Sequence, residues 1–201
     1  MKQNRKTTWH IAILIGVLVL VSTVPLEHSA EASNTSIQGY VDALKSAFRE
    51  LTDRDLQGTV EVTPGSGFEI DPNAKVVKVG ADEFTKSYHG IIGGRGFYLV
   101  AYGLVNLSIP NLPGNGADPL WHFNLTLKKG EFKTELATEV VTYWLLEKVG
   151  SYNGVNLKKI AEYRKSEVIS EYKKIGKAKQ VEWLFKYLND KTIKDVITGV
   201  Y

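Results

Sequence analysis

The segment KTELATEVVTYWLLEKVG, residues 133–150, decides the fold class, because the chain takes up a helical period there and keeps it to its end. Apolar side chains recur along one side of this segment at steps of three and four. Gly150 follows as a suitable C-cap. Two more helices are predicted beyond it, over residues 157–175 with Asn156 as the N-cap and over residues 177–190. The side expected to be buried in the segment is Leu136, Val140, Tyr143, Trp144 and Glu147.

The chain is also helical in period near its beginning. In residues 36–55 apolar side chains recur at helical steps, and Ser36 stands before them as an N-cap. Gly58 begins a change of period, and short strands are predicted at residues 58–64, 67–71 and 75–80. The predicted buried stripe of this first helix is Ile37, Tyr40, Val41, Leu44, Phe48 and Leu51.

Two further strands are predicted in the middle of the chain. Residues 97–109 form a long β-prone run, and residues 121–128 alternate apolar and polar side chains in the manner of a half-buried antiparallel strand. We find no internal repeat. The order of elements predicts an α+β fold, with an N-terminal helix, a twisted and mainly antiparallel sheet, and C-terminal helices packed on one face.

The N-terminal residues have the order of a secretory signal. Basic residues precede the apolar run 11–21, and Ala30-Glu31-Ala32 offers the small side chains of a cleavage site before Ser33. The alternative is an uncleaved anchor that associates with a membrane through residues 11–26. We therefore predict a signal peptide or anchor at 1–32, a single domain at 33–201, and an extracellular or cell-surface location.

Composition excludes several classes of protein. The chain has no Cys, so disulfides and thiolate metal sites are excluded. Its formal net charge of +3 gives no indication of nucleic-acid binding. No cofactor or metal is predicted. The abundance of Lys, Glu, Ile, Val and Tyr is typical of a heat-tolerant organism.

The helix at 133–149 invites comparison with the H-E-x-x-H helix of zinc peptidases. Thr134 and Thr138 occupy the two ligand positions around Glu135, and threonine hydroxyls are poor zinc ligands. The order of strands, a helix with Glu-Leu-Ala and a further helix resembles a gluzincin-type metallopeptidase. The resemblance implies a degenerate scaffold without the zinc-binding histidines, with Glu162 or Glu167 near the place of a third ligand.

Two other patterns have structural interpretations. Glu135 and Glu139 form a like-charge i,i+4 pair, which we assign to a solvated helix face. The glycines of YHGIIGGRGFY, residues 88–98, favour a hairpin or bulge that feeds the long strand. A phosphate loop beside Arg95 is the weaker interpretation, because a strand and not a helix is predicted to follow.

No complete catalytic motif is present, so an enzyme is the less favoured interpretation. The leading hypothesis is a non-enzymatic domain that binds an unknown protein or small molecule at the cell surface. A hydrolase with a site assembled from scattered residues is the other alternative. Its candidate residues are His89, Arg95, His122 and Glu135.

Three Asn-x-Ser/Thr sequons are candidates for glycosylation in an exported protein. They are Asn34, Asn106 and Asn124.

Overall fold

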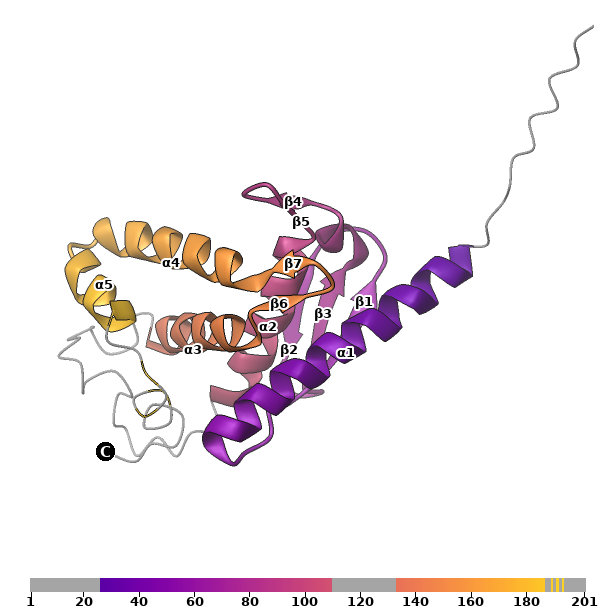
Figure 1. Cartoon of the computed structure of the whole chain (residues 1–201), viewed down its shortest axis with the longest axis horizontal. Coiled ribbons are helices and arrows are strands. Elements are labelled where there is room, and N and C mark those ends of the chain that lie inside the picture. Colours follow the sequence, from indigo (N-terminus) through magenta and orange to yellow (C-terminus); the bar gives the residue numbers. More distant parts are fainter. Residues whose placement is uncertain (1–25, 110–132, 187–188, 190, 192, 194–201) are drawn as a thin grey trace, which may run out of the picture.

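The chain folds as an α+β protein with an N-terminal helix and C-terminal helices, as predicted (Figure 1). A computed structural model describes residues 26–109, 133–186, 189, 191 and 193. The predicted strand at 121–128 and the segment 11–26, apart from Leu26, therefore lie outside the described residues.

The first helix, α1, runs from Leu26 to Thr52, and every residue of its predicted stripe is buried. The helix begins well before Ser36, so Ser36 is not an N-cap, and α1 includes residues 30–32. The N-terminal end of α1 extends beyond the sheet and the other helices (Figure 1).

The three strands predicted after α1 form one sheet. These strands are β1 (Thr59–Thr63), β2 (Phe68–Asp71) and β3 (Val76–Gly80). Their order is β1-β3-β2, with β3 parallel to β1 and antiparallel to β2. The sheet is therefore mixed and not mainly antiparallel. The central strand holds the fully buried Val77 and Val79, which explains why β3 takes the middle position.

The long run predicted as a strand at 97–109 is instead the helix α2, Gly94–Ser108. That prediction was wrong because residues 97–109 are mostly apolar and rich in β-prone aromatic and branched side chains, and such a run occurs in a buried strand as well as in a buried helix. Two of its glycines allow close packing. A Cβ at Gly103 would lie 2.5 Å from the Val77 side chain, and one at Gly96 would lie 2.5 Å from the Phe84 ring.

The C-terminal helices follow the predicted boundaries closely: α3 is Lys133–Val149, α4 is Leu157–Lys173 and α5 is Ala178–Lys186. Gly150 has a φ of 76° and donates its N–H to the Leu146 carbonyl, which confirms the C-cap. Asn156 caps α4 by accepting the Lys159 N–H at 2.9 Å.

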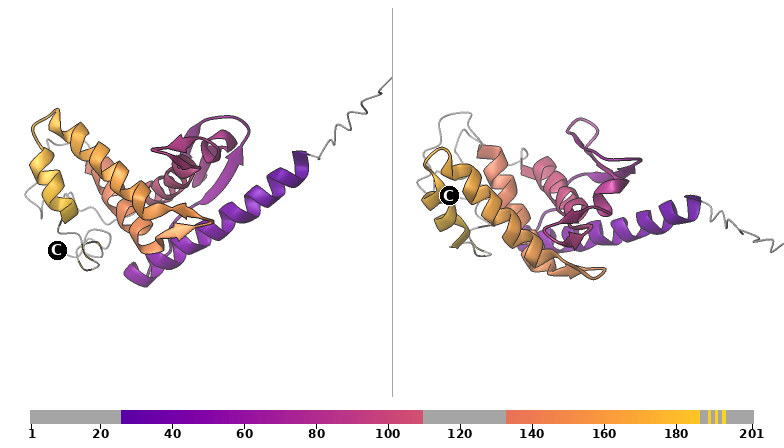
Figure 2. Two further views of the ribbon diagram at one scale, coloured as in Figure 1. Left: turned by 45° about the horizontal axis from the view of Figure 1, so that its top comes forward. Right: turned by 90° about the horizontal axis from the view of Figure 1, so that it is seen from above.

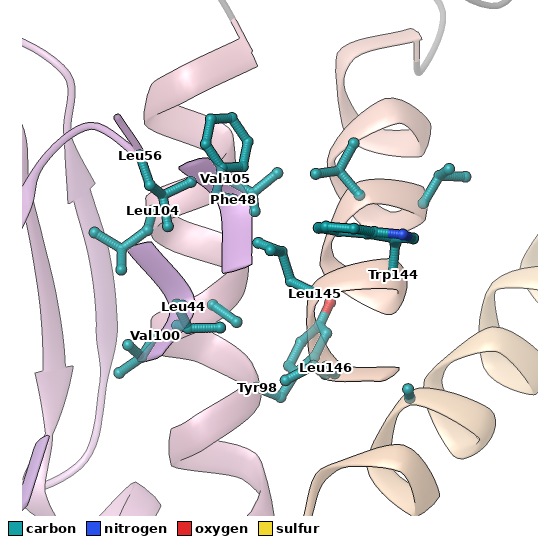
Figure 3. Close-up of a cluster of buried hydrophobic side chains, with 14 of the residues drawn as sticks. Leu44, Phe48, Leu56, Tyr98, Val100, Leu104, Val105, Trp144, Leu145 and Leu146 are labelled. Carbon is teal, nitrogen blue, oxygen red and sulfur yellow. The ribbon is translucent and has the colours of Figure 1, made fainter. Parts of the chain in front are cut away.

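The helices stack in layers behind the sheet. In Figure 3 the sheet, α2, α3 and α4 follow one another, so α2 separates α3 from the sheet. α1 lies across this stack and contacts β1, α2 and α3 (Figure 2). Its Leu44 and Phe48 pack near Leu104 and Leu145, so one core joins all the layers (Figure 3).

Two small hairpins share a short sequence, so the expectation of no internal repeat was wrong at this scale. SYHGII forms β4 (Ser87–Tyr88) and β5 (Ile91–Ile92), and SYNGVN forms β6 (Ser151–Tyr152) and β7 (Val155–Asn156). Their turn residues adopt the same left-handed conformation, with φ values of 48° and 82° at His89-Gly90 and 47° and 78° at Asn153-Gly154. A helix follows each hairpin, α2 after the first and α4 after the second. The predicted hairpin is thus confirmed, but it feeds a helix.

Candidate functional site

An open pocket of about 460 Å³ lies where α2, α3 and α4 meet the edge strand β2. Its rim includes two exposed apolar residues, Phe68 on β2 and Ile175 just after α4. Most of the lining is aromatic or aliphatic, with a few charged side chains. The lining residues are Phe68, Tyr88, Arg95, Tyr98, Leu99, Tyr102, Leu136, Glu139, Arg164, Glu167, Val168, Glu171, Tyr172 and Ile175.

A charged hydrogen-bond network joins three helices at the pocket. Glu139 of α3 accepts a hydrogen bond from the Tyr98 hydroxyl of α2 at 2.9 Å. The same carboxylate accepts from Arg164 Nη2 of α4 at 2.6 Å and from Arg164 Nε at 3.1 Å. The Glu139 side chain is only 8% exposed, so its charge depends on these partners.

Arg164 is the centre of this network. Its Nη1 donates to Glu167 Oε2 at 3.0 Å and to Glu171 Oε1 at 3.2 Å, and its Nε also donates to the Tyr98 hydroxyl at 3.1 Å. Each of its guanidinium nitrogens therefore has a described acceptor. Because the guanidinium lies among the three carboxylates, it occupies the place that a cation bound between them would take.

The first hairpin, β4–β5, binds the carboxylate of Glu167. Tyr88 donates its hydroxyl proton to Glu167 Oε2 at 2.7 Å, and His89 Nε2 lies 2.7 Å from Glu167 Oε1. The His89 ring also stacks on Tyr163 of α4, with ring centroids 4.4 Å apart. The hairpin is thus attached to α4 at the pocket wall.

Burial and hydrogen bonding act on the two main carboxylates in opposite directions. Burial raises the pKa of Glu139, and the hydrogen bonds and charge of Arg164 offset only part of that rise. Burial also raises the pKa of Glu167, but hydrogen bonds from His89, Tyr88 and Arg164 outweigh it, so the net pKa is lowered. These hydrogen bonds therefore keep Glu167 ionised at neutral pH.

Tyr98 and Arg164 stay in their ordinary charge states. Burial, and then the charge of Glu139, raise the pKa of Tyr98, so the phenol stays protonated. Burial alone would lower the pKa of Arg164, but hydrogen bonds and the charge of Glu139 raise it overall. A proton is therefore firmly held at both side chains.

Aromatic rings form a continuous row along the side of the pocket made by β4, α2 and β2. Tyr88 stacks on Tyr98, with ring centroids 6.5 Å apart and planes at 10°. Tyr98 packs against Tyr102 at 5.8 Å, and Tyr102 packs edge-on against Phe68 at 6.2 Å. The guanidinium of Arg164 lies over the Tyr98 ring, 5.6 Å from its centroid.

Arg95, the other cation of the lining, is held from outside the pocket. Its Nε lies 2.8 Å from Oε2 of Glu83, whose side chain is 5% exposed on the short 3-10 helix Ala81–Phe84. Lys86 contacts the other oxygen of the same carboxylate at 2.8 Å. Glu83 therefore balances the charge of Arg95 at the first turn of α2.

The structure brings two of the four candidate catalytic residues to this site. Arg95 lines the pocket, and His89 binds Glu167, which also lines it. His122 and the side chain of Glu135 lie outside the described residues. Glu139, which was assigned to a solvated helix face, is buried, because α3 is covered by α1, α2 and α4.

Sequence reasoning missed Tyr98, Arg164 and Glu171. Arg164, Glu167 and Glu171 follow one another at steps of three and four, so they share a side of α4 with the apolar Val168. That spacing was a signal. It does not stand out in the sequence, because α4 has many exposed charged residues with similar spacing.

The geometry adds no support to the metallopeptidase resemblance, which stays a prediction. α2 separates α3 from the sheet. Glu162 accepts from Tyr143 at 2.6 Å and from Lys165 at 2.9 Å, and Glu167 is held by the hairpin and Arg164. Within the described part of the chain, no group of three His, Asp or Glu residues is arranged to hold a metal ion.

The sequons and the membrane segment are only partly covered by the described residues. The Asn106 amide nitrogen lies 3.5 Å from the Thr138 hydroxyl between α2 and α3, which argues against a glycan on that atom. Asn124 and the side chain of Asn34 lie outside the described residues. Of the helices in the described ranges, none is both long and apolar enough to cross a membrane.

In comparisons with protein-family models, curated proteins and solved structures, the chain matches none of them. The chemistry of the pocket therefore carries the functional argument.

Proposed function

We propose that the protein is an exported or membrane-tethered binding protein without enzymatic activity, and that the pocket between α2, α3 and α4 is its ligand site. The observation that carries the proposal is the combination of an open, mostly apolar pocket with a few fixed charged groups. Its volume of about 460 Å³ falls in the range of roughly 300–1,000 Å³ that is usual for small-molecule sites.

The binding interpretation is favoured over catalysis by the state of the charged groups. Arg164 and Tyr98 satisfy Glu139, while Arg164, Tyr88 and His89 satisfy Glu167. Among the described residues that line the pocket, none is Ser, Thr, Cys, Lys or His. The glutamates, which could act as acids or bases, are held by hydrogen bonds within the network. Such a site orients a ligand and holds its shape, as a binding pocket requires.

Binding is tested with Nile red, a neutral apolar dye whose fluorescence rises in an apolar site. We expect saturable binding to the purified chain, and we expect Leu99→Trp to abolish it, because the larger side chain fills the pocket. A circular-dichroism melt of this variant shows whether the fold is kept.

Two milder variants distinguish a loss of binding from a loss of folding, in case Leu99→Trp does not fold. Ile175→Asn removes an exposed apolar residue from the rim, and Ile92→Asn removes an even more exposed isoleucine from the β4–β5 hairpin, outside the lining. We expect weaker dye binding only for Ile175→Asn. Equal losses in both variants, or no saturable binding at all, would contradict the proposal.

The export half of the proposal is supported by the basic, apolar and small-residue order of residues 1–32. It is tested by intact mass and N-terminal sequencing of the full-length chain after expression and cell fractionation. A product that starts at Ser33, or an uncleaved chain in the membrane fraction, supports export or anchoring. An uncleaved chain found wholly in the cytosol contradicts both.

A further inference from the structure

We propose that the ligand is an organic cation, with an ammonium or guanidinium group attached to an apolar body. This inference rests on the proposed function, because it assigns a ligand class to the same pocket.

The charged side chains that line the pocket favour a cationic ligand. Three carboxylates line the pocket, those of Glu139, Glu167 and Glu171, against two guanidinium groups, those of Arg95 and Arg164. The charge of Arg95 is also offset by Glu83 from outside the lining. Glu171 is 53% exposed, and its Oε1 meets the guanidinium at 3.2 Å. Its carboxylate can therefore turn toward a second positive group without breaking the buried pair of Arg164 and Glu139.

The aromatic row supplies the other half of the recognition. Phe68, Tyr102 and Tyr98 line the pocket next to one another, and the face of an aromatic ring attracts a cation. Arg164 already shows this mode inside the protein, because its guanidinium lies over Tyr98 while carboxylates bind its nitrogens. A ligand cation would use the same chemistry farther along the row, near Tyr102 and Glu171.

An anionic ligand fits poorly. The guanidinium nitrogens of Arg164 already have acceptors within the network, and the Nε of Arg95 is held by Glu83. Any anion that entered would also meet Glu167 and Glu171, and like charges at short range repel. The pocket thus selects by charge as well as by its apolar surface.

The test compares three probes that share a benzyl body. They are benzyltrimethylammonium, its uncharged carbon isostere 2,2-dimethylpropylbenzene, and the anion benzylphosphonate, each titrated by displacement of Nile red. We expect the cation to bind about ten-fold more tightly than the neutral isostere, and the anion to bind most weakly. Added salt should weaken only the cation.

Two matched variants locate the effect. Glu171→Gln should weaken binding of the cation by about three- to ten-fold and leave the neutral isostere unchanged. Glu182→Gln removes the same charge from an exposed position on α5 outside the lining and should change neither. Equal losses in both variants would overturn the proposal, because they would indicate only the overall charge.

The outcomes separate the two proposals. If the neutral or anionic probe displaces the dye as well as the cation does, or if no probe displaces a saturably bound dye, the cation class is overturned and the pocket remains a ligand site. If the dye itself does not bind in the pocket, the proposed function fails.

Discussion

The two hairpins have the same turn and the same Ser-Tyr-x-Gly start, but they attach to different kinds of partner. Tyr88 and His89 of the first both bind Glu167, a carboxylate at the pocket wall. Tyr152 and Asn153 of the second both bind Ser36 on α1, at its carbonyl and hydroxyl oxygens. The same local structure therefore binds a charged side chain in one place and an uncharged serine in the other.

A repeated local motif thus acquires a separate role from the partner it binds. The second hairpin fastens α1 to the core, with Tyr152 beside Tyr40 and Phe97. The first hairpin shares its partner with Arg164, so its attachment depends on the charges of the pocket.

Removal of Arg164 should have the largest effect, because both Glu139 and Glu167 then lose their positive partner. We expect Arg164→Ala to lower the free energy of unfolding by about 3–5 kcal/mol, because Glu139 is left buried without its positive partner. Urea unfolding at pH 7 measures it. The matched control is Arg49→Ala, which removes an ion pair whose side chains are 67% and 63% exposed and should cost about 0–1 kcal/mol.

The hydroxyls of Tyr88 and Tyr152 allow a direct comparison of the two hairpin attachments. Tyr88→Phe removes a hydrogen bond to a charged group and should cost about 1.5–3 kcal/mol at pH 7, whereas Tyr152→Phe removes one to a carbonyl and should cost about 0.5–1.5 kcal/mol. Both are measured by urea unfolding between pH 3 and pH 7.

The pH dependence of these two losses should differ. The pKa of Glu167 is lower in the folded state, partly because Tyr88 donates to it. Its contribution to stability is therefore present at neutral pH and is lost as the pH falls below about 4. The loss for Tyr88→Phe should shrink in that range, and the loss for Tyr152→Phe should stay constant. Parallel curves for the two variants would contradict the assignment.

Gly39 tests how tightly the second hairpin is seated. A Cβ at this position in α1 would lie 2.4 Å from the Tyr152 hydroxyl oxygen. We expect Gly39→Ala alone to cost about 1 kcal/mol, because the ring must move. In the Tyr152→Phe background it should stabilise by about 0.5–1 kcal/mol, since alanine favours the helix. Equal effects in the two backgrounds would mean that the contact is absent.

Exchanging the turn residues should have the smallest effect. His89→Asn keeps a residue that tolerates positive φ and loses a contact whose histidine side chain is 43% exposed, so the change should be below about 1 kcal/mol. Thermal melting at pH 7 measures it. A loss as large as that of Tyr88→Phe would show that His89, and not Tyr88, is the main attachment.

The sequence predicted most of the elements whose apolar residues follow a helical or strand period. The stripe of α1 and the strands β1 to β3 were found in this way, although α1 begins at Leu26, well before the predicted cap at Ser36. The helix α2 was not found, because its apolar and β-prone run is typical of a buried strand as well as of a buried helix. The spacing of Gly96 and Gly103, where the chain approaches Phe84 and Val77, was the available signal.

The candidate site was predicted only in part. His89 and Arg95 were singled out for their chemistry, and both lie at or beside the pocket. Glu139 was misplaced because a pair of glutamates at i and i+4 on a helix is usually solvated, and only the approach of Tyr98 and Arg164 from other helices makes its burial tolerable. Such partners are far apart in sequence, so no local pattern reveals them.

The attachment of the second hairpin to α1 also bears on how the chain folds as it is synthesised. Tyr40, fully buried near the beginning, packs against Phe97 and against Tyr152, which is made much later. A nascent chain that ends before residue 152 leaves one side of this ring uncovered, so α1 cannot close on its core until most of the protein has left the ribosome. Contacts so distant in sequence form late, so the packing around Tyr40 is completed only after most of the chain has been synthesised.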